Sequence, residues 1–260
     1  MKVSIITVSF NSELFIRDAI ESVVHQKYKD IEYIIIDGGS TDKTISIISD
    51  YVKQGKIAKF ISEPDNGIYD AMNKGIKMAT GDIVSFLNSD DLYYDDEVIS
   101  DVVRVFSNSK DTKICYGDAV YVDRHDNKKI IRYWKPGIFS EKKLKKGWQP
   151  CHLAFFAKRE LFEVLGGFKT KYTIAADYEL IVRFIINNKD KAFYLPRIIG
   201  KMRVGGVSSS SFTNILKANI ECYQSLNENN VKVNLSFVVR KPMSKIRQFF
   251  TKRKSETTSE

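Results

Sequence analysis

Residues 83–91 read Ile83-Val84-Ser85-Phe86-Leu87-Asn88-Ser89-Asp90-Asp91. A short apolar run that ends abruptly in polar residues is typical of a strand buried on both faces of a sheet. Similar runs lie at residues 3–10, 33–36 and 59–62, and stretches with helical spacing of apolar residues separate them. This alternation predicts βαβ units, and therefore an α/β fold with a mainly parallel sheet flanked by helices.

Polar side chains stand where the predicted strands end. They are Thr7, Ser9, Asp37, Asp65, Asn88, Ser89, Asp90 and Asp91. Ligands of parallel sheets bind beyond the carboxyl ends of the strands, so we expect these side chains to meet in one crevice. Grouped carboxylates repel one another unless a cation joins them, and hard oxygen ligands select Mg²⁺ or Mn²⁺. A turn of solvated aspartates is the alternative interpretation of residues 88–91.

Several classes of protein are disfavoured by what the sequence lacks. No Gly-x-Gly-x-x-Gly follows the first predicted strand, and no Gly-x-x-x-x-Gly-Lys-[Ser/Thr] occurs. These absences argue against a dinucleotide-dependent dehydrogenase and a P-loop nucleotidase. The three cysteines, Cys115, Cys151 and Cys222, are too widely spaced for a structural zinc site. The first residues do not form a signal peptide, and no apolar run approaches the ~18 residues of a membrane-spanning helix.

The charge is divided unevenly along the chain. Residues 1–123 carry 13 Lys and Arg against 21 Asp and Glu, whereas residues 124–260 carry 28 against 11. The net charge of +9 therefore combines an acidic front half with a strongly basic back half. The first suits a bound cation. The second suits phosphates and an anionic membrane surface better than nucleic acid.

Four motifs carry a resemblance to a known family. They are residues 3–11, Asp37-Gly38-Gly39-Ser40-Thr41-Asp42, Glu63-Pro64-Asp65-Asn66-Gly67-Ile68-Tyr69-Asp70-Ala71-Met72-Asn73-Lys74-Gly75 and residues 86–91. Together they resemble family-2 glycosyltransferases of the GT-A fold. Residues 63–75 are similar to the bacterial branch that builds exopolysaccharide, capsule and O-antigen. A weaker match covers His152, Gly166-Gly167-Phe168 and residues 175–180.

The resemblance implies an inverting transfer of a hexose or N-acetylhexosamine from a nucleotide sugar, most simply a UDP-sugar. The acceptor would be a glycan or a sugar on a polyprenyl diphosphate. Asp37 would hold the nucleobase in a pocket lined by Thr7 and Ser9, and Asp65 would approach the nucleoside. Residues 88–91 would meet the rest of the donor.

Within residues 88–91, Asn88 and Asp90 occupy the two acidic positions of the family's D-x-D motif. Asp90 would bind Mn²⁺ or Mg²⁺, with Asp91 as a second candidate. Asn88 adds no charge, but its amide, with Ser89 beside it, would contact the donor.

The resemblance also implies a general base. Asp177 occupies its position, although the preceding acidic residue of the family is Ala176 here. An acceptor hydroxyl needs such a carboxylate to take its proton as the anomeric bond breaks. The helical pattern alone would make Asp177 a capping or solvated acid.

Three residues of the back half are further candidates. His152 would bind acceptor, donor phosphate or metal, Trp148 would stack on a sugar ring, and Arg203 would close over the diphosphate. Structural roles stay open for His152 and Trp148.

We expect a GT-A domain over residues 1–211, with a nucleotide and metal half at 1–123 and an acceptor half at 124–211. Within the second half, residues 124–146 are basic and lack a clear pattern. A helical basic appendage follows at 212–260, and its residues 240–254 mix cationic and apolar side chains as interfacial anchors do. This predicts a cytoplasmic protein held peripherally at the inner face of the cell membrane; a disordered solubilising tail is the alternative.

Two other functions stay open at this point. A sugar-phosphate nucleotidyltransferase also uses an α/β sheet and Mg²⁺, but would usually carry a Gly-rich basic loop where this chain has Ser9-Phe10-Asn11-Ser12. A non-catalytic protein that binds membranes or nucleic acid would explain the basic half and leave the aspartates unexplained.

Overall fold

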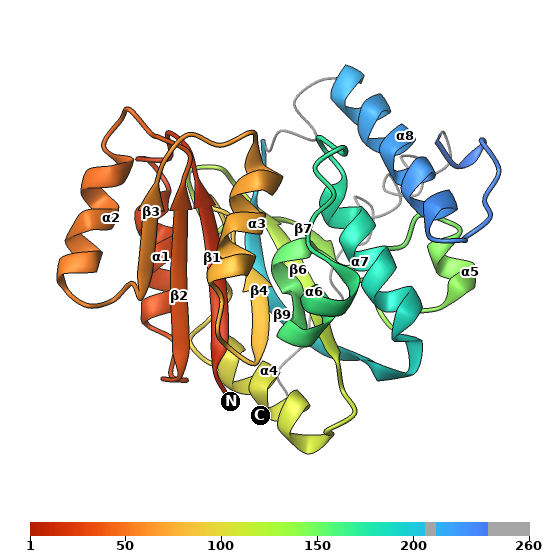
Figure 1. Ribbon diagram of the computed structural model, residues 1–260, viewed down its shortest axis with the longest axis horizontal. Coiled ribbons are helices and arrows are strands. Elements are labelled where there is room, and N and C mark those ends of the chain that lie inside the picture. The colour runs from red at the N-terminus through yellow and green to blue at the C-terminus, as the bar shows by residue number, and fades with distance from the viewer. Residues whose placement is uncertain (206–211, 239–260) are drawn as a thin grey trace, which may run out of the picture.

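The computed structural model describes residues 1–205 and 212–238. In these residues nine strands form one sheet in the order β3-β2-β1-β4-β8-β6-β9-β5, and β7 pairs with β6 (Figure 1). The strands are β1 (Val3–Ser9), β2 (Ile31–Asp37), β3 (Lys59–Ser62), β4 (Ile83–Phe86), β5 (Leu92–Tyr93), β6 (Ile114–Val122), β7 (Ile130–Trp134), β8 (Phe155–Lys158) and β9 (Ala192–Arg203).

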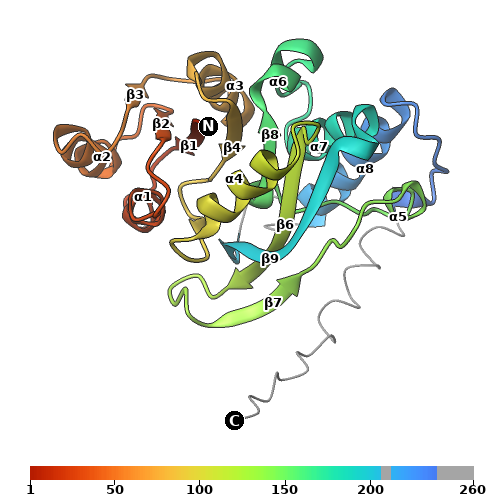
Figure 2. The same cartoon turned by 90° about the horizontal axis from the view of Figure 1, so that it is seen from below.

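The helices cover both faces of the sheet. They are α1 (Ile16–Val24), α2 (Thr44–Lys53), α3 (Ile68–Met78), α4 (Val98–Asn108), α5 (Glu141–Leu144), α6 (Arg159–Leu165), α7 (Ala176–Asn187) and α8 (Phe212–Glu228), with short 3-10 turns η1 (His152–Ala154) and η2 (Lys189–Lys191). One apolar cluster joins α1, α2 and α4 to one face, and another joins α3, α6 and α7 to the opposite face (Figure 2). The core therefore lies on both sides of the sheet, as the apolar strand runs predict.

The front half of the sheet is parallel, as the alternation of strands and helices predicts. β1 pairs in parallel with β2 and β4, and β2 pairs in parallel with β3. The register places Ser9 beside Asp37 and Asp37 beside Ser62. Three polar strand ends are thereby brought together at one edge.

The back half of the sheet is mixed. β8 runs antiparallel between β4 and β6, and β5 runs antiparallel to β9, whereas β6 and β9 are parallel. The basic residues 124–146, which show no clear pattern in the sequence, contribute β7 and α5. β7 is antiparallel to β6 because the few residues between them allow a hairpin, whereas a parallel neighbour needs a long crossover.

α8 packs on α7 and shares an apolar cluster with it. Tyr178 and Val182 of α7 contact the same cluster as Cys222 and Leu226 of α8. The boundary at residue 211 stays a prediction, and the basic stretch at 240–254 lies outside the described residues. No helix in the described part of the chain combines the length and the hydropathy needed to cross a membrane.

Candidate active site

The loop after β4 presents two aspartates with different surroundings. Asp91 is buried, with only 1% of its surface exposed. Asp90 is half-buried, and no side chain among the described residues pairs with its carboxylate, although its backbone carbonyl accepts a hydrogen bond from Arg203. Ser89 Oγ lies 2.8 Å from Ser12 Oγ, which ties the loop to the segment after β1. The Asp90 carboxylate is therefore the one free to meet a ligand.

His152, at the start of η1, connects this loop to the beginning of α7. Its Nε2 lies 2.9 Å from the amide nitrogen of Asn88 and 3.5 Å from Asp91 Oδ2. Its Nδ1 lies 3.8 Å from Asp177 Oδ2. One imidazole thus bridges the predicted metal loop and the predicted general base, which come from segments 86 or more residues apart in the chain.

The charges of this group are coupled. Burial, with a smaller contribution from the charge of Asp90, raises the pKa of Asp91 to about 6, although the hydrogen bond and charge of His152 oppose the shift. Burial alone would lower the pKa of His152, but hydrogen bonding and charge from Asp91, with Asp177 beyond, raise it overall. The raised pKa makes the ring easier to protonate than an ordinary histidine, and in the protonated form both nitrogens donate hydrogen bonds.

A protonated His152 has a consequence for Asn88. The Asn88 amide oxygen is buried without a partner among the described residues, while its nitrogen faces His152 Nε2. Turning the amide by half a revolution would place the oxygen opposite an imidazolium N–H, where it accepts a hydrogen bond, and the amide nitrogen would take the position without a partner. The amide at position 88 can thereby support His152 without adding charge.

Tyr69 holds the backbone just before Asp177. Its hydroxyl donates to the carbonyl oxygen of Ile174 at 2.7 Å and lies 3.4 Å from Asp177 Oδ1. Burial raises the pKa of Tyr69 well above its usual value, with the Asp177 charge adding to the shift, so the hydroxyl stays a donor. The sequence analysis gives Tyr69 no role. Its place inside the motif at residues 63–75 is the feature of the sequence that could have indicated one.

The second polar group lies where β1, β2 and β3 end. Asp37 is fully buried and accepts hydrogen bonds from both Ser9 Oγ and Ser62 Oγ. It also accepts from Ser40 Oγ and from the backbone N–H groups of Gly39 and Ser40. With these five donors the carboxylate orders the turn after β2. A nucleobase would have to replace one of the serine hydroxyls to reach it.

Asp65 approaches this turn from the loop before α3. A Cβ on Gly38 would lie 2.6 Å from Asp65 Oδ2, so a larger residue here would displace the Asp65 carboxylate. Thr7, in contrast, is fully buried, and its hydroxyl pairs with Tyr33 at 3.1 Å inside the fold. The structure therefore brings Ser9, Asp37 and Asp65 together, whereas Thr7 lies in the interior of the fold.

Arg203 and Trp148 are both engaged by the protein. Arg203 is buried at the end of β9, where it donates to the backbone carbonyls of Asp90 and Arg124 and pairs with Asp18. Trp148 is half-buried, donates from Nε1 to Pro136 and packs edge-on against Tyr116 and Phe139. Arg203 thus supports the 88–91 loop, and Trp148 lies in a small aromatic cluster.

The carboxylates of this site suit a divalent cation whose remaining coordination positions are filled by a bound ligand. Among residues 1–205 and 212–238, no three His, Cys, Asp or Glu side chains are arranged to hold a metal by themselves. The Asp90 carboxylate, which pairs with no side chain of the described residues, nevertheless stands beside a buried second acid, Asp91. Mg²⁺ and Mn²⁺ commonly take one or two carboxylates and fill their other positions with water and substrate phosphate, so the residues fit such an ion.

The α/β sheet with carboxylates at its strand ends and the half-buried His152 can now be compared with known proteins. The model of glycosyl transferase family 2 matches residues 4–165. The chain belongs to this family and is a glycosyltransferase. A PGL/p-HBAD biosynthesis glycosyltransferase of Mycobacterium bovis is 29% identical over 209 residues, which cover 80% of this chain and 79% of that protein. An uncharacterized glycosyltransferase of Mycobacterium tuberculosis is 37% identical over 183 residues, covering 70% of this chain and 68% of that protein.

Solved structures share the fold. S. aureus TarS 1–349 in complex with UDP-GlcNAc has a TM-score of 0.72 at 17% identity, covering 92% of this chain and 69% of that one. The chain spans 65% of TarS 1–349 in its complex with UDP. Mannosyltransferase PcManGT from Pyrobaculum calidifontis, in complex with GDP-Man and Mn²⁺, has a TM-score of 0.68 at 18% identity, covering 94% and 73%. These likenesses confirm the GT-A fold.

Proposed function

We propose that the chain transfers a sugar from a nucleoside-diphosphate sugar to an acceptor hydroxyl, with Asp177 as the general base. The acceptor oxygen forms a bond to the anomeric carbon while the bond from that carbon to the diphosphate breaks. The hydroxyl proton passes to Asp177, and the nucleoside diphosphate leaves. Attack on the face opposite the leaving group inverts the anomeric centre.

The observation that carries this proposal is the bridge formed by His152. It lies between the carboxylate of Asp177 and the 88–91 loop, so a single imidazole ring separates the proposed base from the loop proposed to contact the sugar donor. The Asp177 side chain keeps 25% of its surface exposed, and an acceptor can reach it. A charged imidazole beside the base also fixes the direction of the carboxylate.

The donor would lie across the strand ends. Asp37, Asp65 and Ser9 are proposed to contact the nucleoside. Asn88 and Ser89 would contact the ribose and the sugar of the donor. Asp90 would hold Mn²⁺ or Mg²⁺, which neutralises charge on the departing diphosphate. We favour a UDP-sugar of a hexose or N-acetylhexosamine, supported by the UDP-GlcNAc complex of the similarly folded TarS.

The acceptor proposal rests on the sequence. A glycan or a sugar on a polyprenyl diphosphate suits the basic back half, and residues 240–254 suit an anionic membrane surface. Removal of residues 240–260 should then shift the protein from the membrane fraction to the supernatant. An unchanged distribution would contradict the attachment.

The direct test of the reaction is Asp177→Asn. UDP release from UDP-hexoses and UDP-N-acetylhexosamines, measured with glycan and polyprenyl-diphosphate-linked acceptors, should fall by ~10²-fold or more. The thermal shift produced by UDP and Mn²⁺ should stay near that of the wild type. Asp190→Asn is the matched control, because Asp190 is exposed in η2, and it should turn over normally. Normal turnover by Asp177→Asn would refute its role as base.

A further inference from the structure

One carboxylate of α8 organises the backbone that leads into α7. Glu221 is buried, with 6% of its surface exposed. Its Oε1 accepts hydrogen bonds from the N–H and the hydroxyl of Thr173, both at 3.1 Å. Its Oε2 accepts from the N–H groups of Ile174 at 2.9 Å and Ala175 at 2.8 Å. Four donors in three consecutive residues thus converge on one side chain from another helix.

These three residues form the entry to α7, which carries Asp177 in its first turn. The N-cap residue of α7 is Ala175, whose side chain cannot cap the helix. Glu221 therefore supplies from outside the acceptor that a capping side chain usually provides, and its negative charge suits a helix N-terminus.

The peptide at Ile174 is held from two sides. Its N–H donates to Glu221 of α8, and its carbonyl accepts from Tyr69 of α3. α3 and α8 are far apart in the chain, yet both act on a residue three positions before Asp177. The position of the Asp177 backbone is consequently set by elements on both sides of it.

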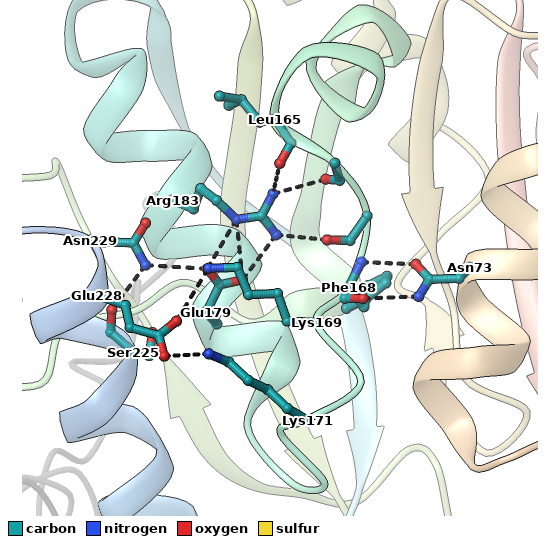
Figure 3. A network of polar contacts seen from close by, with 12 residues as sticks. Asn73, Leu165, Phe168, Lys169, Lys171, Glu179, Arg183, Ser225, Glu228 and Asn229 are labelled. Carbon is teal, nitrogen blue, oxygen red and sulfur yellow. Dashed lines mark hydrogen bonds and ion pairs between the residues drawn. The ribbon is translucent and has the colours of Figure 1, made fainter.

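α8 also fixes the chain just after Asp177. Glu179 is fully buried, and Arg183 donates to it from both Nε and Nη2 (Figure 3). Asn229, which follows α8, donates to the same carboxylate at 3.2 Å, and Lys169 pairs with it at 2.8 Å. Asp177 thus lies between two points, residues 173–175 and Glu179, that are both joined to the α8 segment.

We propose that Glu221 is a positioning residue, which holds the Asp177 carboxylate in line with His152 through the backbone of residues 173–175. The proposal rests on the function proposed for Asp177. A general base acts only within hydrogen-bond reach of the proton that it takes, and a displacement of ~1 Å can cost ~10²-fold in rate. Glu221 and Asp177 both lie outside residues 4–165, which the family model matches.

The test compares Glu221→Ala and Glu221→Gln with Glu228→Gln. Alanine removes all four hydrogen bonds, whereas glutamine keeps one acceptor oxygen for the N–H groups of Ile174 and Ala175. We expect kcat to fall by roughly 10- to 100-fold for alanine and by less for glutamine, with KM for the UDP-sugar within about twofold. Glu228 lies on the same face of α8 and pairs with Lys169 and Lys171, so Glu228→Gln should keep the wild-type kcat.

A second comparison separates positioning from general support of the fold. In the Asp177→Asn background, Glu221→Gln should leave the residual rate unchanged, because the group that it positions is already absent. A wild-type kcat for Glu221→Gln overturns the proposal, as does an equal loss of kcat in both backgrounds. If the alanine variant does not fold, the glutamine variant decides the question. Normal turnover by Asp177→Asn would instead refute the proposed base, and this outcome is distinct from a failure at Glu221.

Discussion

His152 Nδ1 lies 3.8 Å from Asp177 Oδ2, while Nε2 of the same ring lies 3.5 Å from the buried Asp91. The imidazole is 19% exposed, so little water screens its charge from either carboxylate. A cation held between two acids couples their positions, and a change at one end of the ring is felt at the other. The arrangement makes His152 the most sensitive point of the candidate site.

Replacement of His152 by glutamine should lower kcat by about 10- to 100-fold, because the imidazolium no longer orients Asp177 and Asp91 loses its partner. The loss of a partner for a buried carboxylate should also lower the free energy of unfolding by about 1–3 kcal/mol. Steady-state kinetics and thermal unfolding measure the two effects. His125→Gln, at an exposed histidine, is the control. A wild-type kcat in His152→Gln would show that the bridge is dispensable.

Arg203→Lys should weaken the Mn²⁺-dependent binding of UDP by several-fold, because a lysine cannot reproduce the three directions in which the guanidinium donates. One of these hydrogen bonds, from Nη1 to the Asp90 carbonyl at 2.8 Å, fixes the loop that carries the metal candidate. Thermal shift with UDP at increasing Mn²⁺ measures the effect. Arg197→Lys is the matched control, because Arg197 also lies on β9 but pairs with Asp95 and Asp101. Equal Mn²⁺ dependence in the two variants would count against this role.

Acid should destabilise the fold through Glu32. Burial by itself would raise the pKa of this carboxyl, but hydrogen bonds from Lys59, Ser4 and Thr80 hold it at about 2. Because the folded pKa lies below the unfolded value of 4.5, the stabilisation is complete above pH 4.5 and is lost as the pH falls toward 2. The shift corresponds to roughly 3 kcal/mol at neutral pH.

Glu32→Gln should therefore lower the free energy of unfolding at pH 7 and flatten its dependence on pH between about 5 and 2. Denaturant unfolding at several pH values provides the measurement. Glu63→Gln is the control, since its ion pair with Lys74 is largely exposed and contributes little. The same pH dependence in Glu32→Gln and the wild type would rule out this carboxyl as the source.

Gly75→Ala should destabilise the protein by about 1–3 kcal/mol, although alanine favours a helix more than glycine does. A Cβ at this position of α3 would lie 2.4 Å from Ile6 Cγ2, inside the contact between α3 and β1. Thermal unfolding of Gly75→Ala, Ile6→Ala and the double variant measures the clash. The double variant should lose less stability than the two single variants together. If the losses of the two single variants simply add, the cost of the alanine does not come from its contact with Ile6.

The parallel half of the sheet could be predicted because its information is local. Each strand is a short apolar run. Ser9 and Asp37 end β1 and β2, and Asp90 lies in the loop directly after β4. The mixed half could not be predicted in this way, because β8 finds its place between β4 and β6 through contacts distant in the chain. Apolar runs fix where strands occur and say little about the direction in which they pair.

The same distinction applies to the candidate site. Its acids were predicted from strand ends and from the family resemblance, and His152 was predicted without a defined partner. Glu221 was missed because a glutamate in a polar helix is usually solvated, and its partners lie 46 to 48 residues away. Asp37 was selected as a ligand residue, but its five protein donors become visible only when Ser9 and Ser62 are aligned beside it.

The hydrogen bonds that residues 173–175 donate to Glu221 limit how this enzyme can be redesigned. Exchanging the C-terminal helix with that of a relative that lacks this carboxylate would also remove the support proposed for Asp177. A working chimera must therefore inherit a carboxylate at position 221 together with the new helix. The C-terminal helix and the entry to α7 would in this way have to be transplanted as one unit.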